Sequence, residues 1–135
     1  ILGLPVGSHA LELFRPYLER LGVTRSDDLA DLPQGAPLRV AGLLVCRQAP
    51  PTAKGHAFLT LEDEGGLANV ILRPAVHQQY YLLIRTQAAL IAEGTLQIKD
   101  GVVNVLGDRL FPLRLPSGSS GGLSTNSVVR GQFGR

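Results

Sequence analysis

Apolar and polar residues alternate along His56–Glu62, and this period of two predicts a β-strand with one buried face. Because successive side chains in a strand point to opposite faces, Ala57, Leu59 and Leu61 fall on the apolar face, which we expect to pack into a core. An aromatic ring between polar neighbours then lies on the side away from the core. That outer face carries His56, Phe58, Thr60 and Glu62.

A second alternating stretch, Ala68–Leu72, follows the acidic and glycine-rich residues Glu62–Gly66. Consecutive acids followed by two glycines are typical of a tight turn. The two stretches are therefore expected to form a β-hairpin. By the same alternation, Asn69 lies on the outer face of the second strand, while Val70 and Leu72 point inward.

Residues 8–21 show the apolar spacing of a helix. Ser8 can cap its first turn, and Gly22 suits its C-terminal end. Pro16 interrupts the pattern, so we expect a kink or a break into two short helices there. The apolar stripe consists of Leu11, Phe14, Leu18 and Leu21.

A second short helix is expected after Ser26, which would cap it with Asp27 and Asp28 in the first turn. Pro33 ends this helix. The period of the pattern then changes, so residues 1–36 are interpreted as a helical prefix or linker before a domain of a different kind.

The first strand of that domain is predicted to be long and bent. Residues 38–48 form an apolar run with Gly42 near its centre, and a glycine inside a strand often marks a bend or bulge. A bent strand that takes part in two sheets explains why both of its faces are apolar. Cys46, the only cysteine, lies in this run, so we expect it to be a buried small hydrophobe.

The second half of the chain adds a helix and two strands. Pro74 opens a helical segment over residues 74–84, a position that proline tolerates well. Strands are predicted at Ala88–Ile98 and Val102–Leu110, joined by Asp100-Gly101, a strong hairpin signal. The apolar stripe of the helix consists of Val76, Tyr80 and Leu83.

The order of three strands, a helix and two strands, with a long bent first strand, is that of the OB-fold, a five-stranded partly open barrel. We therefore assign residues 37–114 to a mainly β OB-fold domain, preceded by the short helical segment. Ligands of this fold usually lie across strands 2 and 3, flanked by the loops that join strands 1–2 and 4–5. Those loops are Ala49–Gly55 and Lys99–Gly101 here.

The length of 135 residues suits a single domain, and the net charge is only +2. The basic excess is concentrated at the end, where residues 111–135 hold three Arg and no acid. Residues 115–135 are rich in Ser and Gly, so we expect a flexible basic tail. The nearly neutral domain permits contact with a polyanion but does not demand it.

A single cysteine excludes an internal disulfide and suits a reducing compartment, and we expect a cytoplasmic protein. No apolar run approaches the ~20 residues of a membrane span, so no membrane contact is expected. The first residues lack the basic start and the cleavage site of a signal peptide. Because the chain begins with Ile1, we expect it to be a piece of something longer.

Phe58 is the first candidate binding residue, because nucleic-acid bases stack on an outward-facing ring at about 1–3 kcal/mol per base. The alternative is that Phe58 covers a gap under a loop or under the helical prefix. Asn69 either hydrogen-bonds a base edge or is a solvated side chain. Thr60 and His56 join the candidate site because they share the face of Phe58.

Three basic residues near this hairpin, Lys54, Arg47 and Arg73, are candidate phosphate contacts. Phosphate contacts supply affinity and not sequence reading. Arg39 and Lys99 are weaker candidates. Each of these side chains can equally be solvated surface, and the absence of a dense basic patch indicates that the module alone binds weakly.

Nothing in the sequence indicates catalysis. We assign Glu62–Glu64 to the hairpin turn, because neighbouring carboxylates in a strand do not converge on one metal. The histidines His9, His56 and His77 are scattered and lack metal-ligand spacing. We therefore expect no catalytic residue, metal, cofactor or small-molecule substrate in this chain.

The segment RVAGLLVCRQAPPTAKGHAFLTLEDEGGLANVILRP resembles the OB-fold region near the C-terminus of the bacterial C-family DNA polymerases. RQ-x-P-x-TAKG followed by F-x-TLEDE is closer to the error-prone branch of that family. GSHALELFRPYLERLGV resembles the helix before this domain, with Ala10 where the family usually has Pro, and EGTLQIKDGVVNVLGDRL resembles its closing strands. The resemblance runs from about Gly7 to Leu110.

This resemblance implies that the parent protein is a DNA polymerase of replication and damage-tolerant repair synthesis. Its catalytic aspartates, and the Mg²⁺ it is expected to use, would lie upstream of this chain. The module itself is expected to hold single-stranded template DNA or to dock polymerase accessory proteins.

The F-x-x-L-x-D pattern also resembles the anticodon-binding OB domains of class II aminoacyl-tRNA synthetases. There the residue matching Phe58 stacks on an anticodon base, and the residue matching Asn69 contacts a base. Binding of tRNA is therefore the third interpretation.

Overall fold

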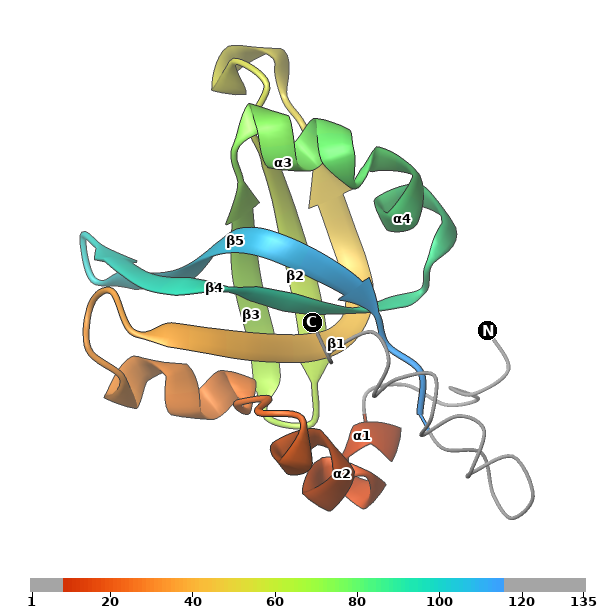
Figure 1. Cartoon of the computed structure of the whole chain (residues 1–135). Helices are drawn as coiled ribbons and strands as arrows, with labels where there is room; N and C mark the ends of the chain where they lie inside the picture. Colours follow the sequence, from red (N-terminus) through yellow and green to blue (C-terminus); the bar gives the residue numbers. More distant parts are fainter. Residues whose placement is uncertain (1–8, 116–135) are drawn as a thin grey trace.

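The computed structural model describes residues 9–115, so the predicted Ser8 cap and nearly all of the predicted tail lie outside the described residues. Within this range the strands close into a barrel in the order β1-β2-β3-β5-β4 (Figure 1). β3 and β5 pair in parallel, and the other neighbours pair antiparallel. The predicted OB-fold, with helix between the third and fourth strands, is confirmed. The strands are β1 (Pro37–Gln48), β2 (Ala57–Asp63), β3 (Gly66–Leu72), β4 (Ala89–Lys99) and β5 (Val102–Pro112).

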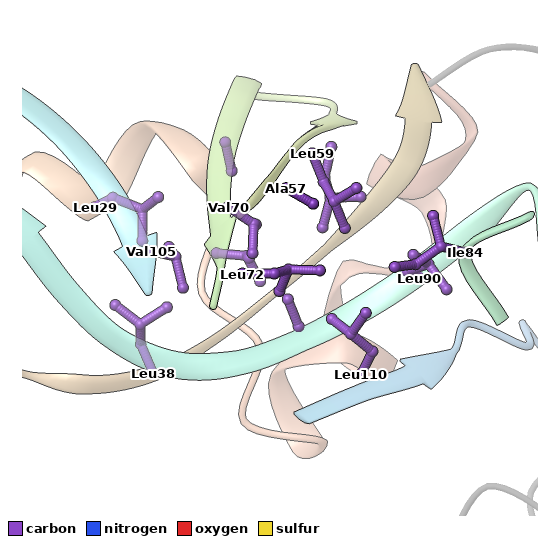
Figure 2. Close-up of a cluster of buried hydrophobic side chains, with 14 of the residues drawn as sticks. Leu29, Leu38, Ala57, Leu59, Val70, Leu72, Ile84, Leu90, Val105 and Leu110 are labelled. Carbon is purple, nitrogen blue, oxygen red and sulfur yellow. The ribbon is translucent and has the colours of Figure 1, made fainter. Parts of the chain in front are cut away.

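The barrel interior is filled by the apolar side chains that alternate along the strands. Leu59 of β2 and Val70 and Leu72 of β3 are each at most 1% exposed. Figure 2 shows these three side chains in one cluster with Leu38 of β1 and Val105 of β5. The alternation predicted for the hairpin is therefore confirmed, and its opposite face is left on the outside of the barrel.

The two halves of β1 pair with different strands of the barrel. Its residues Pro37–Leu43 pair with β4, and Leu43–Gln48 pair with β2. The strand passes so close to β2 that a Cβ on Gly42 would collide with the backbone of Glu62. Residues in the first half of β1 are buried on both faces, as expected, because Ala41 packs outside the barrel against a second apolar cluster.

A β-bulge in β1 reverses the alternation of side chains after Leu44. Leu44 stands opposite Leu61 and Cys46 stands opposite Thr60, so Val45 is left without a partner in the ladder. Because the side-chain period is two, one extra residue moves every following side chain to the other face. The expectation of a buried Cys46 is therefore wrong, and Cys46 is exposed.

The helical prefix consists of two short helices, α1 (Ala10–Leu13) and α2 (Arg15–Arg20), which meet at Phe14. The break predicted near Pro16 is confirmed, with the proline in the first turn of α2. Both helices lie against the barrel (Figure 1), and their apolar side chains join the outer faces of β1 and β4. The buried members of this second cluster are Leu11, Tyr17, Leu18, Val23, Ala41, Ala89, Ile91, Leu113 and Leu115.

Residues Ser26–Asp31 form a short 3-10 helix that Ser26 does not cap. Ser26 instead donates hydrogen bonds to Asp63, from its backbone N to Oδ2 at 2.8 Å and from its Oγ to Oδ1 at 2.6 Å. A partner distant in sequence has replaced the local cap that the pattern predicts. The result is a direct tie between the helical prefix and the turn that joins β2 to β3.

The helical segment predicted over residues 74–84 is divided at Tyr80 into α3 (Pro74–Gln79) and α4 (Tyr81–Thr86). The predicted stripe still packs against the barrel interior. Among residues 9–115 no helix is both long enough and apolar enough to cross a membrane. The residues of the stripe are Val76, Tyr80 and Leu83.

The turn between β2 and β3 carries a largely buried ion pair. Arg15 of α2 donates to Glu64 twice, from Nε to Oε2 at 2.7 Å and from Nη2 to Oε1 at 2.8 Å. The side chains of Arg15 and Glu64 are 11% and 3% exposed. Burial alone would raise the pKa of Glu64, but the hydrogen bonds from Arg15 and the backbone outweigh it, so the pKa lies below its ordinary value.

Asp63 completes the turn. Its Oδ1 also accepts hydrogen bonds from the backbone N of Gly65 at 2.8 Å and of Gly66 at 3.1 Å. The acids are part of a hairpin turn, as expected, and in addition they anchor the helical prefix.

We expect the substitution Arg15→Met to lower the free energy of unfolding by about 3 kcal/mol, because it leaves the Glu64 carboxylate buried without its partner. Urea unfolding at neutral pH measures this loss. The matched control is Arg20→Met on the exposed side of the same helix, which should change stability by no more than about 0.5 kcal/mol. Equal effects of the two substitutions would contradict the structural role of the pair.

The lowered pKa of Glu64 predicts a dependence of stability on pH. A carboxyl whose pKa is lower in the folded than in the unfolded chain stabilises the fold above its unfolded pKa of about 4.3. This contribution is lost as the pH falls through the folded pKa. The stability of Glu64→Gln should therefore fall less than that of the parent chain between about pH 5 and pH 2. Glu19→Gln, on an exposed position of α2, should keep the parent's pH dependence in the same unfolding series.

Candidate nucleic-acid interface

The outer face of β1, β2 and β3 is built from rows of residues that stand directly opposite one another. Opposed residues in antiparallel strands share one face of the sheet. One row is Gln48–Phe58–Ile71, and the next is Cys46–Thr60–Asn69. The structure thus brings Phe58, Thr60 and Asn69 of the predicted site together on adjacent positions of one face.

Phe58 is 38% exposed, so its ring reaches solvent. In the neighbouring row, Thr60 Oγ1 donates a hydrogen bond to Asn69 Oδ1 at 3.4 Å. This contact uses the carbonyl oxygen of the Asn69 amide, so the amide NH₂ group can still donate hydrogen bonds. An aromatic platform beside an amide donor is an arrangement that can stack one base and hydrogen-bond the edge of the next.

The loop between β1 and β2 flanks this face at its open end. It forms a 3-10 turn over Pro51–Ala53, and Lys54 and Gly55 follow in left-handed conformations with φ of 55° and 91°. Gly55 lies so close to Pro74 of α3 that a Cβ would come within 3.1 Å of the proline ring. His56 closes the loop, with Nδ1 at 2.9 Å from the carbonyl oxygen of Ala53, and Lys54 extends into solvent.

The loop between β4 and β5 is the predicted two-residue turn. Asp100 and Gly101 both have positive φ, at 53° and 76°, which matches the twist of the flanking strands. Ile98 and Val102 beside the turn are 40% and 52% exposed. The hairpin tip therefore offers apolar surface near Lys99.

Arg73, predicted as a phosphate contact, is paired. Its Nη2 lies 2.6 Å from Asp108 Oδ1, and both side chains are about half exposed, at 49% and 47%. The carboxylate offsets much of the charge that Arg73 would present to a phosphate. Arg39, the weaker candidate, donates to the carbonyl oxygen of Leu21 at 2.6 Å and serves the contact between the helical prefix and β1.

Arg47 does not lie on the face of Phe58. After the bulge it stands opposite Leu59, whose side chain points toward the barrel interior, so Arg47 is directed to that side as well. There it lines a cavity of about 240 Å³ together with residues of β2 and α4. The register of β1 thus separates Arg47 from the face of Phe58, and its role as a phosphate contact stays a prediction.

Sequence reasoning missed Arg85 of α4, which lines the same cavity. The signal that was available is the distribution of acids. The stretches Cys46–Leu61 and Gly65–Ala92 contain Arg47, Lys54, Arg73 and Arg85 and no Asp or Glu. These two stretches include the end of β1, most of β2, and all of β3, α3 and α4, so these parts of the chain supply basic and no acidic side chains.

No group of three or more His, Cys, Asp or Glu side chains within residues 9–115 could hold a metal ion. The acids of the β2–β3 turn are bound to Arg15, Ser26 and the backbone of the turn. The described geometry brings together an aromatic ring, hydrogen-bonding groups and cationic side chains near the β2–β3 hairpin.

No protein-family model matches the sequence. The chain is similar to proteins named error-prone DNA polymerase from Anaeromyxobacter dehalogenans (strain 2CP-C), at 40% identity over 113 residues, from Corynebacterium efficiens, at 41% over 112, and from Pseudomonas aeruginosa, at 40% over 113. The matches cover 84%, 82% and 84% of this chain but only 10%, 10% and 11% of those proteins. The chain thus spans about a tenth of the length of these relatives.

The barrel is similar to solved structures with little sequence identity. Asparaginyl-tRNA synthetase from Pyrococcus horikoshii matches with a TM-score of 0.58 at 16% identity, over 70% of this chain and 24% of that one. The OBody AM1L10, solved bound to hen egg-white lysozyme, matches with a TM-score of 0.56 at 12% identity, over 69% and 94%. At such identities these likenesses concern the fold alone.

The register of β1 predicts the reactivity of the single thiol. Cys46 is exposed, so a maleimide should modify it in the folded chain at a rate close to that of the unfolded chain. The matched control is Cys46→Ser/Val40→Cys, since Val40 is 0% exposed and its replacement should react only on unfolding. Protection of Cys46 equal to that of the control would show that the bulge is absent.

Proposed function

Because this chain is a homologue of one segment of the error-prone DNA polymerases, we propose that it is a module that binds single-stranded nucleic acid and positions the template strand for such a polymerase. The polymerase would act in replication and damage-tolerant repair synthesis in the cytoplasm. We assign binding and no bond-making step to this segment. Polymerisation, with the Mg²⁺ it is expected to require, belongs in this proposal to other parts of the parent protein.

The observation that carries the proposal is the exposed ring of Phe58 on the outer face of β2. Phe58, the second residue of β2, is 38% exposed and leaves apolar surface in water, although the inward side chains Ala57, Leu59 and Leu61 of the same strand are buried. A stacked base removes that surface from water and requires no particular sequence. Asn69 and Thr60, one row away, add a polar contact to the next nucleotide.

Lys54 supplies the positive charge next to this face. It extends from the loop between β1 and β2, in a stretch of the chain without acids, and has no ion-pair partner among residues 9–115. A lysine in that position suits a phosphate of a strand that lies across β2 and β3. His56, at the start of β2, borders the same end.

A second candidate function is the docking of a polymerase accessory protein on the same face. Leu67 of β3, two rows from Phe58, is 59% exposed, and the bulge residue Val45 is 50% exposed, so this side of the hairpin has apolar area of the kind that protein partners cover. The OBody AM1L10, whose structure is similar to this barrel, was solved bound to another protein, lysozyme.

We expect the 135-residue chain to bind oligo-dT at low salt, and the substitution Phe58→Ala to weaken this binding about tenfold or more, the loss of one stacked base. Lys54→Ala should weaken binding less and flatten its dependence on salt by about 0.7 in the log–log slope. Fluorescence anisotropy with a labelled oligonucleotide measures both.

The control is Leu13→Ala, which removes an exposed apolar side chain from α1, at 80% exposure, and should leave affinity unchanged. Unchanged affinity in both Phe58→Ala and Lys54→Ala would refute the site. Binding of folded tRNA in preference to oligo-dT would favour the tRNA interpretation, and capture of an accessory protein without any oligonucleotide binding would favour docking.

A further inference from the structure

A cavity of about 240 Å³ lies between the end of β1, the beginning of β2 and α4, on the other side of the sheet from Phe58. Its walls combine an apolar floor with a cationic rim. Leu59 and Ile84 form part of the floor, and both are labelled in the buried cluster of Figure 2. The cationic and aromatic rim is formed by Arg47, Arg85, His77 and Tyr81.

The two guanidinium groups on the rim are not neutralised by the described part of the chain. Neither Arg47 nor Arg85 has a carboxylate within ion-pair distance among residues 9–115. By contrast, the arginines at positions 15, 25, 39 and 73 each face an acid. Two arginines that line one cavity without a carboxylate partner favour the binding of an anion there.

The guanidinium of Arg85 is also held in place. It lies over the ring of Tyr81, with Cζ at 5.5 Å from the ring centroid, and His77 packs against the same ring at 5.9 Å with an interplanar angle of 59°. A cation–π contact restricts the side chain without using its hydrogen-bond donors. Arg85 is thus oriented, with its N–H groups still available to an acceptor.

We propose that this cavity is a second subsite for the same nucleic-acid strand, in which Arg47 and Arg85 hold one phosphate and the apolar floor receives the adjoining nucleotide. The volume is below the ~300–1,000 Å³ of pockets for drug-sized ligands, so it suits one group of a longer ligand and not an entire separate molecule. Planar guanidinium groups match the oxygens of a phosphate in pairs, and the floor excludes water from the contact.

Gln48 borders both the cavity and the outer face. This residue stands opposite Phe58 in the outer row and also lines the cavity. A strand stacked on Phe58 therefore reaches Arg47 by passing the end of β1, without crossing the barrel. The inference rests on the proposed function, since it concerns the path of the strand beyond Phe58.

The test compares two oligo-dT lengths in low salt with the 135-residue chain, one of about 4 nucleotides and one of about 16, the range of site sizes for one OB-fold. Arg47→Gln/Arg85→Gln should weaken binding of the longer oligonucleotide about tenfold and leave that of the shorter one unchanged. For the longer oligonucleotide, the slope of log affinity against log salt concentration should become shallower in the double variant by about 0.7 for each phosphate no longer contacted. Phe58→Ala should weaken binding of both lengths. Arg20→Gln removes an equally exposed charge from α2 and serves as the control.

If the double substitution behaves like Arg20→Gln while Phe58→Ala still weakens binding, the second subsite is refuted and the proposed function stands. If the double substitution weakens both lengths equally, there is one site and not two. If neither length binds the parent chain, the proposed function fails and the subsite with it. A further probe is an acidic peptide that contains Leu and Glu. If it binds the parent chain but not the double variant, and the two bind oligonucleotide equally well, the cavity belongs to a protein partner and the second subsite is refuted.

Discussion

The single unpaired residue Val45 in β1 determines how the charged end of this barrel is arranged. Before the bulge, alternate side chains of β1 fill the interior of the barrel; after it, the alternation is reversed. Arg47 is thereby turned toward the cavity beside α4, and Cys46 and Gln48 come to lie with Thr60 and Phe58 on the outer face. The bulge therefore decides which β1 side chains join the outer face of β2 and β3 and which line the cavity.

A second constraint operates at the opposite end of the β2–β3 hairpin. Asp63 accepts hydrogen bonds from Ser26, and Glu64 is bound by Arg15. The elements that supply these partners also supply apolar residues to two separate clusters: Leu29 to the barrel interior and Leu18 to the cluster outside it. One turn therefore connects the barrel, the 3-10 helix and the helical prefix, and it holds the strands that carry Phe58 and Asn69 in position.

The hairpin face was predictable from the sequence because its two strands alternate cleanly between apolar and polar residues. That pattern places Phe58, Thr60 and Asn69 outside and Leu59 inside, and the order of elements predicts the barrel. The bulge was not predictable, because β1 is apolar on both faces in its first half and such a run contains no alternation from which a change of register can be read. The hydrogen bonds of Ser26 to Asp63 and of Arg15 to Glu64 were not predictable either, since the partners lie 37 and 49 residues apart in the chain.

The two ends of the β2–β3 hairpin differ in how freely their sequence can vary. Residues 62–66 contact the backbone and side chains of distant segments, so a change there disturbs both apolar clusters at once. The loop at the other end, residues 49–56, meets few neighbours beyond Pro74 and projects Lys54 into solvent. Under the proposed function, a change in the length or charge of that loop would alter its contact with the ligand without removing the buried ion pair and hydrogen bonds of residues 62–66. The contacts that tie the prefix to the barrel and the loop that borders the proposed binding face thus lie at opposite ends of the same pair of strands, so one can vary without the other.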